Sequence, residues 1–249
     1  MADQQKPVSE QEVIEVADLL ARAYPYIGGR KQAEGVLTDS PLESLVRSIL
    51  SQNTTDVNRD RAFAALRGEF PSWEQVAEAP TEQVMEAIRE TNYAYTKAER
   101  IQQILRQLRE EHGAATLDFL REWPTERILK YLTGFKGVGK KSAAIVALFS
   151  LKRPVVPVDT HVYRVTQRLG WIGEKTTPER AHDVLQQLIP AELIFPLHTG
   201  MWEHGRVTCR PKPRCGQCAI YRFCLYPEKT APMPPVEEAI AITAGKEGA

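Results

Sequence analysis

The chain has 249 residues, of which 43% are hydrophobic and 26% are charged, and 32 basic residues balance 32 acidic ones. This composition supports a full hydrophobic core, in one domain or in two small ones. No apolar run approaches the roughly 20 residues of a transmembrane helix, and the polar N-terminus carries no secretion signal. We therefore expect a soluble cytoplasmic protein. The neutral net charge argues only weakly against nucleic-acid binding, because binding uses local patches of charge.

Nearly every periodic segment of the sequence predicts a helix. A serine stands three residues before a glutamate at residues 9–12 and 40–43, which is the capping pattern of a helix N-terminus. Further helices are expected at residues 57–67, 73–78, 82–89, 96–111, 118–121, 126–132, 161–169, 178–188 and 191–204. The one strand-like run, residues 155–156, lies between two prolines, so no sheet is expected. Residues 227–249 are rich in proline, alanine and charge, and we expect them to be disordered.

Residues 132–142, with the sequence LTGFKGVGKKS, are the most informative segment. They predict a helix, a tight hairpin and a second helix that begins near Lys140. Gly137 and Gly139 allow backbone conformations closed to other residues, and they let N–H groups approach an anionic surface. The N-terminus of a helix adds partial positive charge, so a phosphate is the expected ligand. The residues expected to contact phosphates here are Lys136, Gly137, Val138, Gly139 and Lys140.

Two residues at and after this hairpin suggest chemistry on a nucleic acid backbone. Lys141 supplies an amine, and Asp159 supplies a carboxylate within the later segment PVDTH. Each residue also has an ordinary explanation, because a lysine beside a hairpin commonly contacts phosphate and an aspartate before a helix commonly caps it. The residues alone leave catalysis and these structural roles equally open.

All four cysteines lie in one window with the spacing C-x5-C-x2-C-x5-C. They are Cys209, Cys215, Cys218 and Cys224. In a chain that is expected to be cytoplasmic, such a window favours a metal site over disulfides or four free thiols. Four thiolates can hold a [4Fe–4S] cluster or a tetrahedral zinc ion, and the single C-x2-C pair favours iron–sulfur without excluding zinc. The basic residues Arg210, Lys212 and Arg214 lie between the first two cysteines, and we expect them to contact a DNA backbone.

Taken together, these motifs resemble the endonuclease III-type DNA glycosylases of the helix–hairpin–helix superfamily. The resemblance rests on the hairpin and on the segments LSQNTTD, KAE, VDTHVYRV, HGR and KPRCGQC, and it covers about residues 9–226. It implies an all-α fold of two lobes. Residues 37–150 would form a six-helix barrel that ends in the helix–hairpin–helix. Residues 1–36 and 151–226 would form the lobe that carries the iron–sulfur loop, with residues 227–249 outside both.

The resemblance also implies an activity in base excision repair. The family removes oxidised pyrimidines, such as thymine glycol, from duplex DNA and then nicks the strand at the abasic site. By this resemblance Lys141 is the nucleophile that forms a Schiff base with the sugar, and Asp159 is the carboxylate that assists. The resemblance further implies that the four cysteines bind a [4Fe–4S] cluster. It also implies a monomer of prokaryotic type, associated with the nucleoid, whose partner is duplex DNA with a damaged base or an abasic site.

Several positions depart from the family pattern. Lys136 stands where many relatives have a proline, and the gap between the first two cysteines is one residue shorter than usual. Gln52 and Asn53 stand where many relatives place a glutamine that fills the hole left by the flipped base. Tyr93 occupies the place where relatives commonly have an aliphatic residue that wedges into the opposite DNA strand. An aromatic side chain at this place would intercalate between bases. These departures leave the reaction type intact and leave the lesion preference open.

Three alternatives to this function remain at the level of the sequence. An adenine glycosylase acting opposite damaged guanine, or a thymine or uracil mismatch glycosylase, would share much of the pattern but would usually lack the hairpin lysine. The third alternative is a DNA-binding module without activity, in which the metal is purely structural. The presence of Lys141 favours a glycosylase that also nicks the strand.

Overall fold

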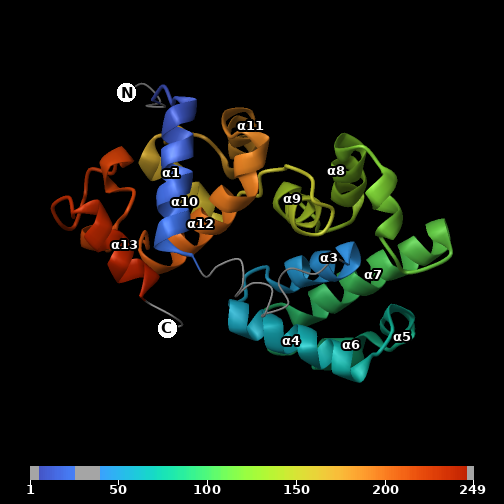
Figure 1. Cartoon of the computed structure of the whole chain (residues 1–249). Helices are drawn as coiled ribbons and strands as arrows, with labels where there is room; N and C mark the ends of the chain where they lie inside the picture. The colour runs from blue at the N-terminus through green and yellow to red at the C-terminus, as the bar shows by residue number, and fades with distance from the viewer. Residues whose placement is uncertain (1–5, 26–39, 246–249) are drawn as a thin grey trace. The chain divides into compact units, whose positions relative to one another are not determined.

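The structure is a computed structural model that describes residues 6–25 and 40–245 (Figure 1). Regular structure in these two ranges is entirely helical, which confirms the all-α fold class. The helices are α1 (Glu10–Ala23), α3 (Pro41–Leu50), α4 (Asp56–Glu69), α5 (Trp73–Glu78), α6 (Thr81–Ala87), α7 (Ala94–His112), α8 (Thr125–Gly134), α9 (Lys140–Phe149), α10 (Thr160–Leu169), α11 (Pro178–Leu188), α12 (Ile194–Val207) and α13 (Val236–Ala244). No described helix combines the length and the hydrophobicity that a membrane crossing requires.

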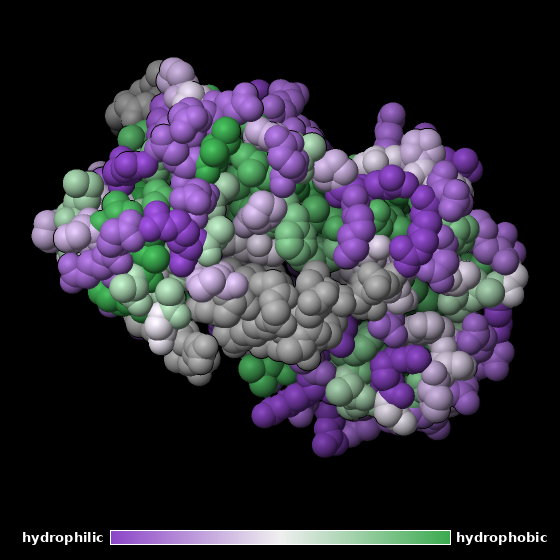
Figure 2. Space-filling model, in the orientation of Figure 1, coloured by the Kyte–Doolittle hydropathy of each residue, from purple (hydrophilic) through white to green (hydrophobic). Residues whose placement is uncertain are grey.

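The chain forms two compact units. The hairpin unit is Leu37–Arg153, and the cysteine unit is Met1–Val36 together with Pro154–Ala249. The boundary that the sequence places between residues 36 and 37 lies outside the described residues. On the face drawn in Figure 2, hydrophobic surface occurs in small areas among hydrophilic residues.

The core of the hairpin unit forms around α7, its longest helix. Ile101, Leu105 and Leu108 repeat at helical spacing on one face of α7, and all three are fully buried. This face packs against α3, α5 and α6. Gln102, which is 1% exposed, donates through Nε2 to the carbonyls of Val76 and Ala79 at 2.9 and 2.7 Å. These bonds satisfy buried polar groups and fix α5 against α7.

Helices α1, α10 and α12 pack closely in the cysteine unit because α12 carries two glycines at the contacts. A Cβ atom at Gly200 would lie 2.9 Å from Cβ of Leu20 on α1. A Cβ atom at Gly205 would lie 2.7 Å from Cβ of His161 on α10. Both distances are shorter than ordinary carbon contacts, so any larger residue would force these helices apart. Trp171, fully buried after α10, donates through Nε1 to Glu12 at 2.7 Å.

The expectation of a disordered tail is wrong for its described part. Residues 236–244 form α13, and residues 246–249 lie outside the described residues. Ala239, Ile240 and Thr243 are buried on one side of this helix, which packs against α1. Composition predicted disorder because proline and charge dominate the tail. The spacing of these three residues nevertheless gives α13 one narrow apolar face, and α1 covers it.

Paired substitutions in α13 test this packing. Ala239→Asp places a carboxylate at a fully buried position and should lower the free energy of unfolding by about 2–4 kcal/mol. Ala241→Asp, two residues away at an exposed position, should change it by less than about 0.5 kcal/mol. Urea unfolding followed by circular dichroism measures both. Equal effects of the two substitutions would show that α13 is not packed in solution.

Candidate active site and cysteine centre

The hairpin between α8 and α9 is anchored from beneath by two apolar side chains. Phe135 and Val138 are 3% and 5% exposed and belong to the core of the hairpin unit. Val138 N donates to the Phe135 carbonyl at 3.1 Å, which closes the turn. Lys136, Gly137 and Gly139 are exposed. Val138 can therefore contact a ligand only through its backbone. The exposed residues beside it form the surface that the sequence predicts to bind phosphate.

Gly137 is fixed by contacts from two other segments. Its φ of +84° lies in the left-handed region, which favours glycine. Gln52 Nε2 donates to the Gly137 carbonyl at 3.0 Å, and Arg100 Nη1 donates to Gln52 Oε1 at 3.3 Å. The Arg100 side chain covers the glycine so closely that a Cβ atom there would lie 2.8 Å from its Cδ and Nε atoms. The turn therefore depends on residues far away in the sequence.

Lys141 lies in the first turn of α9, directly after the hairpin. Gly139 is the N-cap and has no side chain, so the cap residue itself gives the first turn of α9 no side-chain bond. Lys140 is exposed, whereas Lys141 is half-buried. The next residue, Ser142, is 4% exposed and accepts from Ser48 Oγ on α3 at 2.9 Å. This contact fixes the start of α9 on the core and leaves an amine beside a site suited to phosphate.

Two further loops of the hairpin unit carry exposed residues in the left-handed conformation. Asn53 follows α3 with a φ of 52°, and Tyr93 precedes α7 with a φ of 58°. Tyr93 is 71% exposed, which is unusual for a large aromatic residue. The Asn92 side chain donates from Nδ2 to the Asn53 carbonyl and so joins the two loops. Because the amide of Gln52 is bonded to the hairpin, Asn53 and Tyr93 are the exposed members of the predicted set of three.

Lys97 of α7 is a functional candidate that residue-by-residue reasoning missed, since the sequence marked it only as part of a family motif. It is 2% exposed, yet its ammonium donates three hydrogen bonds. The acceptors are the Leu50 carbonyl at 2.8 Å, the Gln52 carbonyl at 2.7 Å and Thr54 Oγ1 at 2.9 Å. Burial lowers the pKa of Lys97 to about 8, and the nearby Arg100 charge adds to this. The side chain is therefore still mainly an ammonium ion at neutral pH.

Asp159 caps α10 in the cysteine unit, as the sequence predicts. Its Oδ1 accepts from the backbone N–H groups of His161 and Val162 at 2.9 and 2.8 Å. The preceding residues Val155, Val156 and Val158 are buried. They fix the backbone from which the half-exposed Asp159 side chain emerges. Both bonds use the same oxygen of a half-exposed side chain, so the carboxylate is oriented without being enclosed.

The other end of α10 holds the first cysteine. Arg164 donates to the Cys209 carbonyl at 2.8 Å and to the Gly205 carbonyl at 2.7 Å. Arg168 Nη1 lies 3.3 Å from Cys209 Sγ and 2.8 Å from the Arg210 carbonyl, and its guanidinium stacks on Tyr226. Both arginines thus fix the backbone at the start of the basic loop.

All four cysteines line one cavity, together with Arg168 and Tyr221. The described residues include no group of three or more His, Cys, Asp or Glu side chains arranged to hold a single metal ion. Burial and the neighbouring cysteines raise the pKa of the Cys218 and Cys224 thiols. Four thiolates therefore need a positively charged partner in this cavity.

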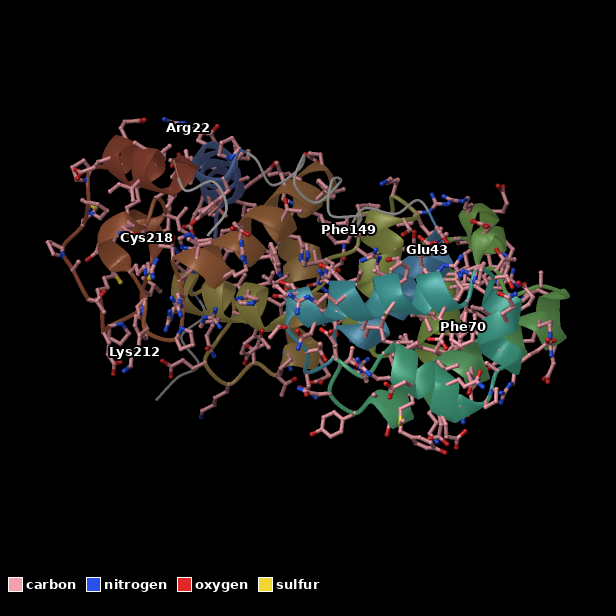
Figure 3. All side chains as sticks on the ribbon, turned by 90° about the horizontal axis from the view of Figure 1, so that it is seen from below. Arg22, Glu43, Phe70, Phe149, Lys212 and Cys218 are labelled. Carbon is pink, nitrogen blue, oxygen red and sulfur yellow. The ribbon has the colours of Figure 1, made fainter. Side chains whose placement is uncertain are left out.

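His204 lies beside Cys218, one of the four cysteines. Its Nε2 lies 3.6 Å from Cys218 Sγ, and its Nδ1 bonds to the Tyr24 hydroxyl at 2.8 Å. Complete burial holds the pKa of His204 well below its usual range, so the ring is neutral. The basic residues Arg210, Lys212 and Arg214 are exposed on the loop, and Figure 3 shows Lys212 at the same end of the unit as Cys218.

Comparison with known proteins agrees with this architecture. Residues 46–191 match the model of the HhH-GPD superfamily of base excision DNA repair proteins. The chain belongs to this superfamily. It is 36% identical over 185 residues to endonuclease III of Thermotoga maritima, which is 74% of this chain and 82% of that protein. Its fold matches an endonuclease III–DNA complex with a TM-score of 0.74 and 25% identity, covering 88% of this chain and 96% of the other.

Some relatives in the superfamily are longer. An Arabidopsis thaliana protein is 38% identical over 169 residues, and this chain spans 58% of its length. The matches nevertheless identify a DNA glycosylase of the endonuclease III type, as the motifs predict.

Two glycine substitutions test the geometry of the hairpin. Gly137→Ala forces a side chain into a left-handed φ and against Arg100, so it should lower the free energy of unfolding by about 1–2 kcal/mol. Gly139→Ala, at a φ of −95° with no atom within 4 Å of the new Cβ, should change it by less than about 0.5 kcal/mol. Urea unfolding measures both variants. A Gly137→Ala variant as stable as Gly139→Ala would contradict the assigned turn.

Proposed function

We propose that the protein is a bifunctional DNA glycosylase and abasic-site lyase that removes oxidised pyrimidines, such as thymine glycol, from duplex DNA. One observation carries the proposal: a half-buried amine, Lys141, follows directly on an exposed glycine hairpin at the N-terminus of α9. The hairpin and helix terminus would hold a phosphate, which places the attached sugar within reach of that amine. The similarity to endonuclease III supports the choice of substrate.

In this reaction the Lys141 amine attacks C1′ of the flipped nucleotide as the damaged base leaves. The attack forms a C–N bond, breaks the glycosidic bond and passes through a Schiff base, after which β-elimination releases the 3′ phosphate. The amine must be neutral to attack. Lys140 and the positive end of α9 both disfavour a second ammonium ion at this place. Asp159, oriented by the N-terminus of α10, would stabilise positive charge on the sugar and accept protons.

Duplex DNA is the proposed partner, and two sets of residues would contact its backbone. The hairpin offers the exposed residues Lys136, Gly137, Gly139 and Lys140, and the cysteine loop offers the exposed side chains Arg210, Lys212 and Arg214. Because these contacts are mainly electrostatic, binding should weaken steeply with salt.

We propose that Cys209, Cys215, Cys218 and Cys224 hold a [4Fe–4S] cluster. Four thiols around one cavity, with a single C-x2-C pair among them, support this choice over a single zinc ion. When bound, the cluster would cross-link four points of a loop that has little core of its own. Arg168, beside Cys209 Sγ, would offset part of the negative charge of the thiolates.

The metal content tests this assignment. The purified protein should contain about four iron atoms per chain and absorb light at about 400 nm. The Cys218→Ser variant should lose most of the iron and most of this absorbance. Metal analysis and absorbance spectroscopy measure the outcome. If protein purified without chelators is colourless and contains one zinc ion per chain, the cysteines hold a tetrahedral zinc ion and the cluster assignment is wrong.

Borohydride trapping tests the nucleophile. The native protein should form a covalent complex with a duplex that contains thymine glycol and with one that contains a preformed abasic site. Lys141→Ala should reduce trapping on both by about a thousandfold or more, because no other amine occupies its place. Lys140→Ala is the matched control, since it removes the neighbouring lysine and should retain trapping within about tenfold.

The other outcomes of this experiment separate the alternatives. Undiminished trapping by Lys141→Ala would overturn the assignment of the nucleophile. Base release without trapping by the native protein would indicate a monofunctional glycosylase. If the protein binds these duplexes and mismatched ones but shows neither base release nor trapping, it is a DNA-binding module without activity.

A further inference from the structure

Two exposed loop residues of the hairpin unit are held in an unfavourable backbone conformation. Asn53 and Tyr93 both have a positive φ, which asparagine tolerates but a bulky aromatic residue rarely adopts. Tyr93 also begins α7 without any side-chain cap bond. Such a conformation persists only where neighbouring groups impose it, and it commonly occurs at functional sites. The contacts that impose it therefore identify further residues of the site.

Lys97 contacts both loops at once. Its backbone N–H donates to the Tyr93 carbonyl at 3.0 Å, which fixes the start of α7. Its ammonium donates to the Leu50 and Gln52 carbonyls and to Thr54 Oγ1 at 2.7–2.9 Å, which fixes the turn that carries Asn53. One residue thus determines the positions of the two strained residues.

A lysine is the side chain that these acceptors require. The Leu50 and Gln52 carbonyls lie at the C-terminal end of α3, where partial negative charge collects. The ammonium has three donors on one atom, whereas a neutral amide has two and the guanidinium group is a wide planar fork. A site that is 2% exposed has no room for water to replace a missing donor.

Further bonds make the two loops one rigid surface. Thr54 Oγ1 accepts from Asn92 N at 3.3 Å and donates to the Gln52 carbonyl at 3.2 Å. The Asn92 side chain bonds to the Asn53 carbonyl. Gln52, in turn, donates to the Gly137 carbonyl of the hairpin. The loop with Asn53, the loop with Tyr93 and the phosphate-binding hairpin are therefore connected through polar contacts centred on Lys97.

We propose that Lys97 is a positioning residue that holds Asn53 and Tyr93 ready to occupy the space left in the duplex when the damaged nucleotide leaves the stack. This role rests on the proposed function. Lys97 is enclosed and touches no substrate, so it acts through Asn53 and Tyr93 alone. Base release from an intact duplex needs this preformed pair, because unstacking a nucleotide leaves a gap that must be filled. Cleavage at a preformed abasic site needs it less, because no base has to be extruded.

Lys97→Met tests the proposal, since methionine keeps the aliphatic part of the side chain and removes all three donors. Base release from a thymine glycol duplex under single-turnover conditions should fall by about 20-fold or more. Trapping on a preformed abasic site should fall by less than about threefold. A third duplex carries the fluorescent base 2-aminopurine opposite a tetrahydrofuran abasic analogue. Saturation with the variant should change the 2-aminopurine fluorescence less than saturation with the native protein. Lys130→Met, at an exposed lysine of the same unit, should behave as native in all three measurements.

A second pair of variants serves if Lys97→Met folds poorly. Thr54→Val removes the hydroxyl that bonds to Lys97 and Asn92 but keeps the shape, whereas Thr54→Ser keeps the hydroxyl. Thr54→Val should lower base release selectively, and Thr54→Ser should restore it. Native behaviour of folded Lys97→Met, or equal behaviour of the two Thr54 variants, would overturn the proposal. If the native protein traps neither duplex, the proposed function fails, and the fluorescence change on binding still tests the role of Lys97.

Discussion

The buried ammonium of Lys97 is the interaction on which the exposed surface of the hairpin unit depends. An apolar core fixes the helices of this unit, but it cannot fix three loops whose backbone groups need hydrogen-bond partners. Lys97 satisfies three oxygens at a position where water has no access. A buried charge commonly stabilises a fold less than apolar packing would, and its benefit is the choice of one conformation. Here that conformation includes the strained Tyr93.

In the cysteine unit, arginine side chains fix a loop in the same way, by donating to its backbone carbonyls. Arg164 and Arg168 project from successive turns of α10 and bond to carbonyls around Cys209 and Arg210. The opposite end of this helix is capped by Asp159, so the charges follow the helix dipole, with the carboxylate at the N-terminus and the arginines towards the C-terminus. One helix of ten residues therefore connects the candidate catalytic carboxylate with the anchor of the cysteine loop.

The features that the sequence predicted correctly are those set by residues near one another along the chain. Helix starts at Ser9 and Ser40 follow from local capping, and the cap at Asp159 follows from the same rule. The bond from Gln52 to Gly137 and the three bonds of Lys97 join segments more than 40 residues apart, and no periodicity encodes them. Helix α13 escaped detection because its apolar face has meaning only once α1 is in place.

The two departures at the exposed loops are best understood as one change. By the family resemblance, Asn53 stands in the place of a longer glutamine, and Tyr93 stands in the place of a smaller aliphatic residue. Because Asn92 bonds to the Asn53 carbonyl and directly precedes Tyr93, these side chains start from one connected backbone surface. Under the proposed function, a shorter amide leaves volume that a ring can fill, and the ring can also stack on neighbouring bases. The rigid attachment through Lys97 is what would let a strained tyrosine enter the duplex without first losing conformational freedom.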